Sequence, residues 1–343
     1  MLDTKDSSAI LSSVQYYLSD KNNSPFLFHP DWARIISGKE EGGYGWVAYN
    51  YLKQIIGPKR NRDSNEEPYA VVEMGGASLQ VSQQALTKED IASIPAEHLF
   101  KFTIEKDHYT LYVHSYLGYG AEQAREKVNN LLSSSVTGNE LVDPCLNTGY
   151  IRDKPPSAVY EGVALTSGVV KGGSTSDSCS ASVHKALFTH DDTKCDKAKP
   201  LGIGCVSQPS FIPNSKNILI FENFYYTFSA LSVPSVTGSS QFPLVTTANL
   251  IKHKSDEICS SDWSTVQAEY PKDNSGKDVN LKLCFSSSFA VEFLLNGLRI
   301  DQEKAVTVQR EVAGNEIEWA LGAAYKNIAD YLKKGNLRFG HGN

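Results

Sequence analysis

Two short segments of the chain contain residue types that bind and cleave phosphate groups. In EEGGYGW, Glu40 to Trp46, two adjacent carboxylates precede glycines, and in VVEMGGASLQVS, Val71 to Ser82, a glycine pair separates two apolar runs. A Gly-Gly turn between strands exposes backbone N–H groups, and consecutive N–H groups form a concave nest for anions. The pattern is compatible with one phosphate site built from both segments.

Polar side chains flank the glycine pair. Glu73 precedes it and is placed to hold a hydrated cation beside a phosphate. Ser78 and Gln80 share one face of the following strand, because residues two apart in a strand point the same way. Glu41 or Glu40 would then orient or deprotonate an attacking water. If these two neighbours lie in extended backbone they face opposite sides, so only one should enter the cleft.

Each feature also has an ordinary structural explanation. Gly-Gly hairpins are common in proteins that bind nothing, paired glutamates most often lie on a solvated surface, and a nearby tryptophan is more often a core residue. The serine and the glutamine are compatible with ordinary cross-strand polar pairs. No single feature is specific, and only their combination favours a site.

The composition is ordinary for a globular protein. The 343 residues are a soft indication of about two domains, and the net charge of -6 gives no basic surface for nucleic acid. No apolar run approaches the roughly 18 residues that span a bilayer, so we expect no membrane segment in this chain. The beginning, MLDTKDSSAILSS, lacks the basic and apolar regions of a signal peptide.

The cysteines indicate an oxidising compartment. None of the six is part of a CxxC or other zinc pattern, and an even, dispersed set suits disulfides. Six idle thiols in a cytosolic protein remain the alternative on spacing alone. All six lie in the second part of the chain: Cys145, Cys179, Cys195, Cys205, Cys259 and Cys284.

Hydrophobic periodicity predicts the elements that must position these residues. Strands come first and helices later, which indicates an α/β or α+β domain, and a Ser, Gly and Thr stretch at 166–182 reads as a loop that Cys179 would pin. We expect strands at 69–74, 78–83, 100–104 and 109–116 and helices at 7–18, 121–132, 246–254, 261–269, 285–295 and 316–334.

Long segments of the chain resemble one protein family. ARIISGKEEGGYGWVAYNYL, Ala33 to Leu52, looks like the third conserved region of the apyrases or nucleoside triphosphate diphosphohydrolases, which include Golgi nucleoside diphosphatases, and VVEMGGASLQVS looks like the fourth. Further matches follow in the family's order: HSYLGYGAEQAR, DPCLNTGY, GCVSQPSF, FENFYYTFSAL, LCFSSSFAVEFLLNGL and EWALGAAY.

The resemblance implies an α/β, actin-like (RNase H-like) fold of two lobes with a nucleotide between them. It implies hydrolysis of nucleoside tri- and diphosphates of the ATP, ADP, UDP or GDP class with Ca²⁺ or Mg²⁺. The family's first two conserved regions, a DxGSS-like loop and a TAGxR-like segment, are not found, so we expect an incomplete N-terminal lobe. The division expected is 1–37 as a remnant of that lobe, 38–309 as the C-terminal lobe and 310–343 as a helix returning to the N-terminal lobe.

The resemblance also assigns roles to residues. Glu41 matches the general base, Tyr226 matches an aromatic that stacks on the nucleobase, and Thr148 stands where some animal members have a base-flanking arginine. Glu73 stands where the family usually has aspartate holding the metal's water shell. Phe224 and Phe228 should be core. Ser78 and Gln80 match residues that orient the water, and Gly75, Gly76 and Ala77, with Ser78, match the loop that embraces the terminal phosphate.

The family's late disulfide maps onto Cys259 and Cys284, and four further cysteines leave three connectivities open. The implied location is extracellular or in the lumen of the secretory pathway.

Three functions are therefore weighed. The first is an apyrase-type hydrolase whose sequence here is truncated, the second is a catalytically inactive nucleotide-binding remnant, and the third is a sugar kinase-like phosphotransferase of the same broad fold. The water-activating glutamate motif speaks against the third. Because the helices at 7–18 and 316–334 would lack the sheet that they cover in the family, we also expect an unusual exposed apolar surface.

Overall fold

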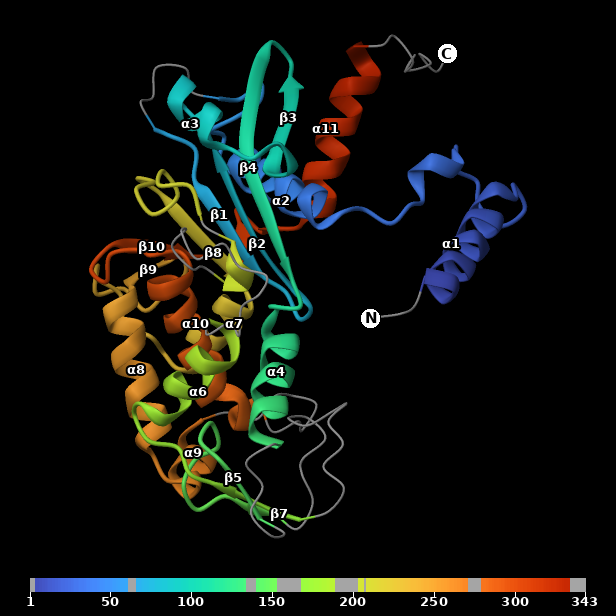
Figure 1. Ribbon diagram of the computed structural model, residues 1–343. Coiled ribbons are helices and arrows are strands. Elements are labelled where there is room, and N and C mark those ends of the chain that lie inside the picture. Colours follow the sequence, from blue (N-terminus) through green and yellow to red (C-terminus); the bar gives the residue numbers. More distant parts are fainter. Residues whose placement is uncertain are drawn as a thin grey trace.

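A mixed β-sheet forms the centre of the structure (Figure 1). The computed structural model describes residues 4–60, 66–133, 140–152, 168–188, 203–206, 208–270 and 279–333. Within these ranges the sheet has seven strands in the order β3-β4-β2-β1-β8-β10-β9. The strands are β1 (Ala70–Met74), β2 (Ser78–Gln84), β3 (Leu99–Ile104), β4 (Asp107–Leu117), β8 (Ile218–Glu222), β9 (Leu244–Thr247) and β10 (Ala305–Val308).

The predicted glycine hairpin is confirmed and lies in the middle of the sheet. β1 pairs antiparallel with β2, with Glu73 opposite Gln80, and parallel with β8, with Met74 opposite Glu222. The carboxyl ends of β1 and β8 therefore lie side by side at one edge of the sheet. The two strands expected at 100–104 and 109–116 are also confirmed, as the antiparallel pair β3 and β4.

One face of the sheet is covered by α2 (Gly38–Leu52), against which α11 (Trp319–Lys333) packs. Trp46 of α2 is fully buried there among the side chains of β3 and β4, so it is a core residue. The backbone of Glu40 and Glu41 is helical, and the extended backbone considered from the sequence is wrong. Ser37 caps this helix through a capping box with Glu40, which explains why it begins at Gly38.

The other face carries the larger core. Phe224 is 1% exposed and Phe228 is not exposed at all, which confirms that both are core residues. Seven helices belong to this part of the described structure, and Figure 1 shows most of them gathered at one end of the sheet. They are α4 (Ala121–Ser133), α6 (Ser178–Leu187), α7 (Asn223–Ala230), α8 (Ala248–Ser260), α9 (Trp263–Glu269) and α10 (Leu283–Glu292), with α3 (Lys88–Ser93) beside the sheet.

Two disulfides among the described residues link segments of this helical part. Cys259–Cys284 joins α8 to α10 as the resemblance implied, and its loop should stabilise the fold by about 3 to 4 kcal/mol in the chain-entropy model. Cys145 pairs with Cys179, so Cys179 does pin its segment. The side chains of Cys195 and Cys205 lie outside the described residues.

The loop expected at 166–182 is wrong where the structure describes it. β7 (Val169–Gly172) pairs with β5 (Glu140–Asp143) and β6 (Ile151–Arg152) in a three-stranded sheet, and α6 begins at Ser178. Pairing with these distant strands, together with the disulfide, overrides the low strand and helix preference of Ser and Gly.

Several predicted helix boundaries shift because neighbouring strands claim their ends. Thr246 belongs to β9, and Thr247 caps α8. Glu316 belongs to β12 (Asn315–Glu316), which pairs with β11 (Glu311–Val312) before α11 begins. α10 continues into a π-helical turn, Phe293–Gly297. Short 3-10 turns, among them η2 (Ala96–His98) and η4 (Val279–Lys282), connect other elements.

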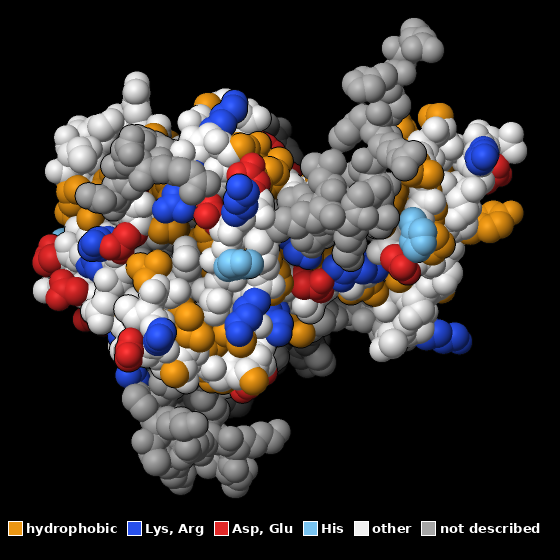
Figure 2. Space-filling model, turned by 90° about the horizontal axis from the view of Figure 1, so that it is seen from above, with side chains coloured by type: hydrophobic (Ala, Val, Ile, Leu, Met, Phe, Trp, Pro, Cys, Tyr) orange, Lys and Arg blue, Asp and Glu red, His pale blue; other side chains and the backbone are white. Residues whose placement is uncertain are grey.

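The N-terminal helix α1 (Thr4–Ser19) projects from the body on an extended segment (Figure 1). None of its residues is buried, and Phe26 and Leu27 after it are each 81% exposed. The expected exposure of apolar side chains is thus seen on this arm, which forms the right-hand part of Figure 2. None of the described helices is both long enough and apolar enough to cross a membrane.

Candidate functional site

The loop between β1 and β2 is held by its carbonyl groups. The N–H groups of Ala121 and Glu122, in the first turn of α4, donate to the carbonyls of Gly75 and Gly76 at 2.9 Å. The N–H of Gly118 donates to the carbonyl of Ala77 at 2.9 Å. Each carbonyl of the loop is therefore directed toward the chain segment that leads into α4.

This arrangement exposes backbone N–H groups on the opposite side of the loop. In a trans peptide the N–H points away from the preceding C=O, so the N–H groups of Gly76 and Ala77 point away from α4. No hydrogen bond within the described structure engages these two N–H groups. The N–H of Gly75, by contrast, donates to the carbonyl of Ser78 and closes the hairpin. The N–H groups of Gly76 and Ala77 are thus the ones that an anion could approach, and Gly75 closes the hairpin beside them.

Gly120 allows α4 to approach the loop. A Cβ atom at Gly120 would lie 2.5 Å from both the carbonyl carbon of Gly76 and the amide nitrogen of Ser78. No side chain fits at that distance. The sequence analysis did not single out this glycine, although it stands in the HSYLGYGAEQAR segment that carried part of the resemblance.

Three of the predicted catalytic residues meet next to this loop. Nε2 of Gln80 donates to Oε2 of Glu41 at 2.7 Å and to Oγ of Ser78 at 2.7 Å. The side chain of Gln80 is almost fully buried, so its orientation is set by packing. Glu41, Gln80 and Ser78 therefore form one polar cluster on the α2 face of the sheet.

Glycines in the first turns of α2, Gly38 and the Gly42 of EEGGYGW, let this helix lie close to the sheet. A Cβ at Gly42 would lie 2.9 Å from Oγ of Ser82 and 3.1 Å from Cβ of Gln80. A Cβ at Gly38 would lie 2.2 Å from Oγ of Ser115. These glycines bring the first turn of α2 onto β2 and β4, which is how Glu41 reaches Gln80.

Ser115 is a site residue that the sequence analysis missed. It lies opposite Gln80 in the pairing of β2 and β4, and its Oγ is 3.5 Å from Nε2 of Gln80. The signal in the sequence is indirect, because the register of two strands must be known before Ser115 can be placed next to Gln80.

Glu40 points away from this cluster, as expected, but for a helical reason. Successive residues in a helix are separated by about 100° around its axis. The carboxylate of Glu40 accepts hydrogen bonds from Arg34 and from the backbone N–H of Ser37. The hydrogen bond from Arg34 lowers the pKa of Glu40 to about 2. Glu40 is therefore a structural anion at the start of α2.

The two carboxylates on the site side have the opposite shift. Burial raises the pKa of Glu41, and the hydrogen bond from Gln80 opposes that rise. Burial raises the pKa of Glu73 to about 8, and the charges of Glu41 and Glu222 add to it. The candidate site thus has a partly desolvated carboxylate, Glu41, and a second, more deeply buried one, Glu73, whose Oε2 has no hydrogen-bond partner among the described residues.

Glu73 is the residue whose surroundings fit a hydrated cation. Its Oε2 is buried and has no hydrogen-bond partner within the described residues. Carboxylate oxygens suit Ca²⁺ and Mg²⁺, and Mg²⁺ keeps several of its waters. No cluster of three or more His, Cys, Asp or Glu residues able to hold a metal is found in the described part of the chain. The fit is therefore to an ion held by Glu73 through water.

The end of β8 adds two residues that the sequence analysis did not assign. Glu222 lies beside the end of β1 with a φ of 62°, a left-handed conformation that is uncommon for a glutamate. Burial raises the pKa of Glu222, while Arg310 opposes that rise. Nδ2 of Asn223 donates to the carbonyl of Met74 at 2.8 Å and ties the start of α7 to the end of β1.

Tyr226 lies one turn further along α7. Its side chain is 48% exposed, and the guanidinium carbon of Arg310 lies 5.8 Å from the centre of its ring. Unlike Phe224 and Phe228, it is available to a ligand. Thr148 occupies the position at which some members of the family have an arginine beside the base. Its hydroxyl donates a hydrogen bond to the carbonyl of Ser174.

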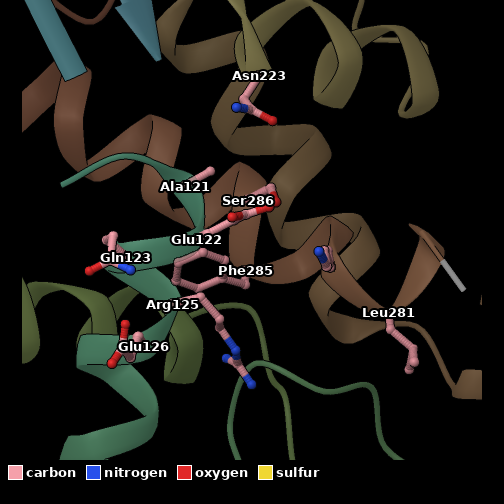
Figure 3. A pocket seen from close by; sticks show the side chains of 10 residues that line it. Ala121, Glu122, Gln123, Arg125, Glu126, Asn223, Leu281, Phe285 and Ser286 are labelled. Carbon is pink, nitrogen blue, oxygen red and sulfur yellow. The ribbon is translucent and has the colours of Figure 1, made fainter. Parts of the chain in front are cut away.

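A cavity of about 270 Å³ opens between α4, α7 and α10, near the loop between β1 and β2. Figure 3 shows Glu122, Arg125 and Glu126 of α4 on one side, Asn223 above, and Phe285 with Ser286 beyond. Glu122 borders both the cavity and the loop, because its Oε2 would lie 3.2 Å from a Cβ at Gly76. The guanidinium of Arg125 lies over the Phe285 ring and is paired with Asp143, so these side chains are held in place.

Comparison with known proteins gives a family match over almost the whole chain. Residues 1–338 match the family described as GDA1/CD39 (nucleoside phosphatase). The chain is 30% identical over 324 residues to "Probable apyrase 4" of Arabidopsis thaliana, covering 90% of this chain and 58% of that protein.

Two further relatives carry hydrolase names. The chain is 29% identical to "Ectonucleoside triphosphate diphosphohydrolase 3" of Homo sapiens, covering 91% of this chain and 58% of that protein. It is 28% identical to "Guanosine-diphosphatase" of Candida albicans, covering 94% of this chain and 56% of that protein. The chain therefore spans somewhat more than half the length of these relatives.

A solved structure supports the fold. The crystal structure of nucleoside triphosphate hydrolases from Neospora caninum matches with a TM-score of 0.68 at 15% identity, covering 98% of this chain and 72% of that one. The expected α/β, actin-like architecture is thus in agreement with this structural neighbour.

Proposed function

Because the chain belongs to the GDA1/CD39 nucleoside phosphatase family, we propose that it removes the terminal phosphate of nucleoside tri- or diphosphates by hydrolysis. The observation that carries the proposal is that the amide of Gln80 holds both Glu41 and Ser78, the residue that follows the unengaged N–H groups of Gly76 and Ala77. The attack of water on a phosphate needs a base that takes the proton of the water and N–H donors that stabilise the charge on the phosphate oxygens. Strand β2 and the loop before it bring both together.

Glu41 accepts the proton of the attacking water. A carboxylate with a raised pKa is a better base near neutral pH than an ordinary one, and burial raises the pKa of Glu41. The hydrogen bond from Gln80 keeps the carboxylate in place and opposes its protonation. Ser78 provides a hydroxyl on the same side to orient the water, because the amide of Gln80 holds it too.

The terminal phosphate lies on the N–H groups of Gly76 and Ala77, with Gly75 and Ser78 shaping the loop around it. Glu73 would hold the water shell of Ca²⁺ or Mg²⁺, and this cation, when bound, supplies positive charge against the phosphate oxygens. The nucleobase stacks on Tyr226.

We infer the remaining properties from the relatives. The substrates are nucleotides of the ATP, ADP, UDP or GDP class, and the protein acts outside cells or in the secretory pathway, where disulfides such as Cys259–Cys284 persist. The lobes divide at 1–37, 38–309 and 310–343. An inactive nucleotide-binding remnant and a sugar kinase-like transferase find no support in the names of the relatives.

The test is single-turnover hydrolysis of ATP, ADP, UDP and GDP with Ca²⁺ or Mg²⁺. Glu41→Gln should lower kcat by roughly 10²- to 10⁴-fold, the usual share of a general base, while binding of a non-hydrolysable analogue is kept. Glu40→Gln is the matched control, because glutamine also completes a capping box. It should keep turnover near that of the wild type.

Two results would contradict the proposal. Near wild-type turnover in Glu41→Gln, or equal losses in both variants, would remove Glu41 as the base. A wild-type protein that neither binds nor hydrolyses any of the four nucleotides would contradict the function itself.

A further inference from the structure

Two histidines outside the nucleotide site face each other across a gap between η2 and β4. Nδ1 of His98 lies 3.1 Å from Nδ1 of His114, and the rings are nearly perpendicular, with an interplanar angle of 89°. Both side chains are partly buried, neither fully exposed nor closed off from solvent. The ring of Tyr112 packs against His98 and the ring of Tyr116 against His114, with centroid distances of 5.5 and 4.2 Å.

The separation of the two nitrogens matches that of two ligands on one metal ion. A Zn–N bond of about 2.0 to 2.1 Å and a near-tetrahedral angle place two ligating nitrogens about 3.1 to 3.4 Å apart. The observed 3.1 Å falls in this range. A neutral imidazole carries one proton, so each ring can keep its proton on Nε2 and present the lone pair of Nδ1.

The surroundings favour the neutral rings that a metal needs. Burial lowers the pKa of His98, Glu97 opposes this, and Lys39 adds to it. Burial, followed by the charge of His98, lowers the pKa of His114 to about 4. Metal ions compete with protons for imidazole. Because both pKa values are lowered, protons compete less with a metal for these two rings than for an exposed histidine.

We propose that His98 and His114 form a binding site for one divalent transition-metal ion, distinct from the cation of the nucleotide site. Imidazole nitrogens suit Zn²⁺, Cu²⁺ and Ni²⁺, whereas Ca²⁺ and Mg²⁺ prefer oxygen ligands. Since no third His, Cys, Asp or Glu completes a cluster among the residues that the structure describes, water fills the other positions and the ion exchanges readily.

The position of this site gives the bound ion a structural effect. His98 ends η2, immediately before β3, and His114 lies in β4 next to Ser115. An ion on both rings would join the edge of the sheet to β4. It would stabilise the folded state by an amount that rises with the logarithm of the free ion concentration above its Kd, since it binds the folded chain in preference to the unfolded one.

The test is calorimetric titration of the protein, freed of any affinity tag, with Cu²⁺, Ni²⁺ and Zn²⁺ separately, and thermal unfolding with each ion. We expect one site per chain, tightest for Cu²⁺ as the usual order of divalent metals requires. His98→Ala and His114→Ala should each weaken it by at least about tenfold, because even partners of metal ligands contribute 10- to 100-fold. The Cu²⁺ electron paramagnetic resonance spectrum should show two coupled nitrogens.

Control variants make the result specific. His108→Ala removes an exposed histidine of the same β-ribbon, bonded to Thr103, and should leave the site intact. His98 lies on a short surface turn, so His98→Ala is expected to fold even if His114→Ala does not. Mg²⁺ and Ca²⁺ should neither bind there nor displace Ni²⁺.

Other outcomes overturn the proposal. These are a wild type without a one-to-one site, a site unchanged in His98→Ala, an equal loss in His108→Ala, or a spectrum with one coupled nitrogen. The two histidines would then be a neutral hydrogen-bonded pair only. Nucleotide hydrolysis is not a readout here, so failure of this proposal leaves the proposed function untouched.

Discussion

Nε2 of Gln80 donates a hydrogen bond of 2.7 Å to Oε2 of Glu41, although 39 residues separate the two along the chain. Glu41 belongs to helix α2 and Gln80 to strand β2, so this bond joins the layer of helices to the centre of the sheet. The same amide nitrogen reaches Ser78 beside the phosphate loop. The contact determines where the proposed base lies relative to the phosphate.

Removing this bond should change the pH dependence of hydrolysis. The hydrogen bond from Gln80 lowers the pKa of Glu41 by stabilising its charged form, so Gln80→Ala should raise that pKa. Since the base must be deprotonated, the acid limb of the kcat profile should move to higher pH. Gln84→Ala, on the same strand and face but four residues away, is the control and should leave the limb in place. If the acid limb of the kcat profile stayed in place in Gln80→Ala, Gln80 would not control the pKa of the catalytic base.

Because α2 lies close to the sheet, substitution of one of its glycines should lower the stability of the fold more than substitution of another. Gly42→Ala would bring a Cβ to 2.9 Å from Oγ of Ser82, and such overpacking costs about 1 to 3 kcal/mol. Gly45→Ala, in the same helix, meets its nearest atom at 3.4 Å, an ordinary contact, and gains up to about 1 kcal/mol of helix propensity. In urea unfolding, the free energy of unfolding of Gly45→Ala should be higher than that of Gly42→Ala. Equal stabilities would contradict the packing argument.

Loss of the exposed ring on α7 should weaken nucleotide binding. Stacking of a base on an aromatic side chain contributes about 1 to 3 kcal/mol, so Tyr226→Ala should raise the Kd of an ADP or GDP analogue by roughly 5- to 150-fold. Tyr226→Phe keeps the ring and should bind nearly as the wild type does. Tyr16→Ala, on the exposed arm, controls for a general effect. Equilibrium binding that is the same for Tyr226→Ala and the wild type would rule out stacking there.

The ion pair at the start of α2 should make folding stability sensitive to acid. Arg34 lowers the pKa of Glu40 to about 2 in the folded chain, below its ordinary value of 4.5. The stabilisation is therefore complete above about pH 4.5 and is lost as the pH falls toward 2. In Glu40→Gln the free energy of unfolding should depend less on pH within this window. Denaturant titrations at pH 3 to 6 measure it, with Glu89→Gln of the exposed first turn of α3 as the control.

Local pattern was sufficient for part of the fold. The hairpin around Gly75 and Gly76 follows from two apolar alternating runs with a glycine pair between them, and the structure has that hairpin. The core positions of Phe224 and Phe228 follow from an apolar run in the same way. Such features depend on residues close together in the chain, so their spacing alone predicts them.

The sequence predicted several residues of the candidate site but not how they are arranged. Resemblance named Glu41, Ser78 and Gln80, and the structure brings these three together. It did not name Ser115, because that serine reaches Gln80 only through the register of β2 and β4.

The sequence by itself determined the hairpin, the family and two carboxylates of the candidate site, Glu41 and Glu73, but not Glu222. Tertiary structure alone decided that α2 is a helix with Glu40 turned toward Arg34, that Gly76 and Ala77 present the N–H groups of the loop, and that Cys145 pairs with Cys179. The turn of Glu40 toward Arg34 follows from the helical backbone of α2, whose packing on the sheet, like the loop contacts and the disulfide, joins segments distant in the chain. Their free energy comes from packing and hydrogen bonding across that separation, for which spacing along the sequence provides no measure.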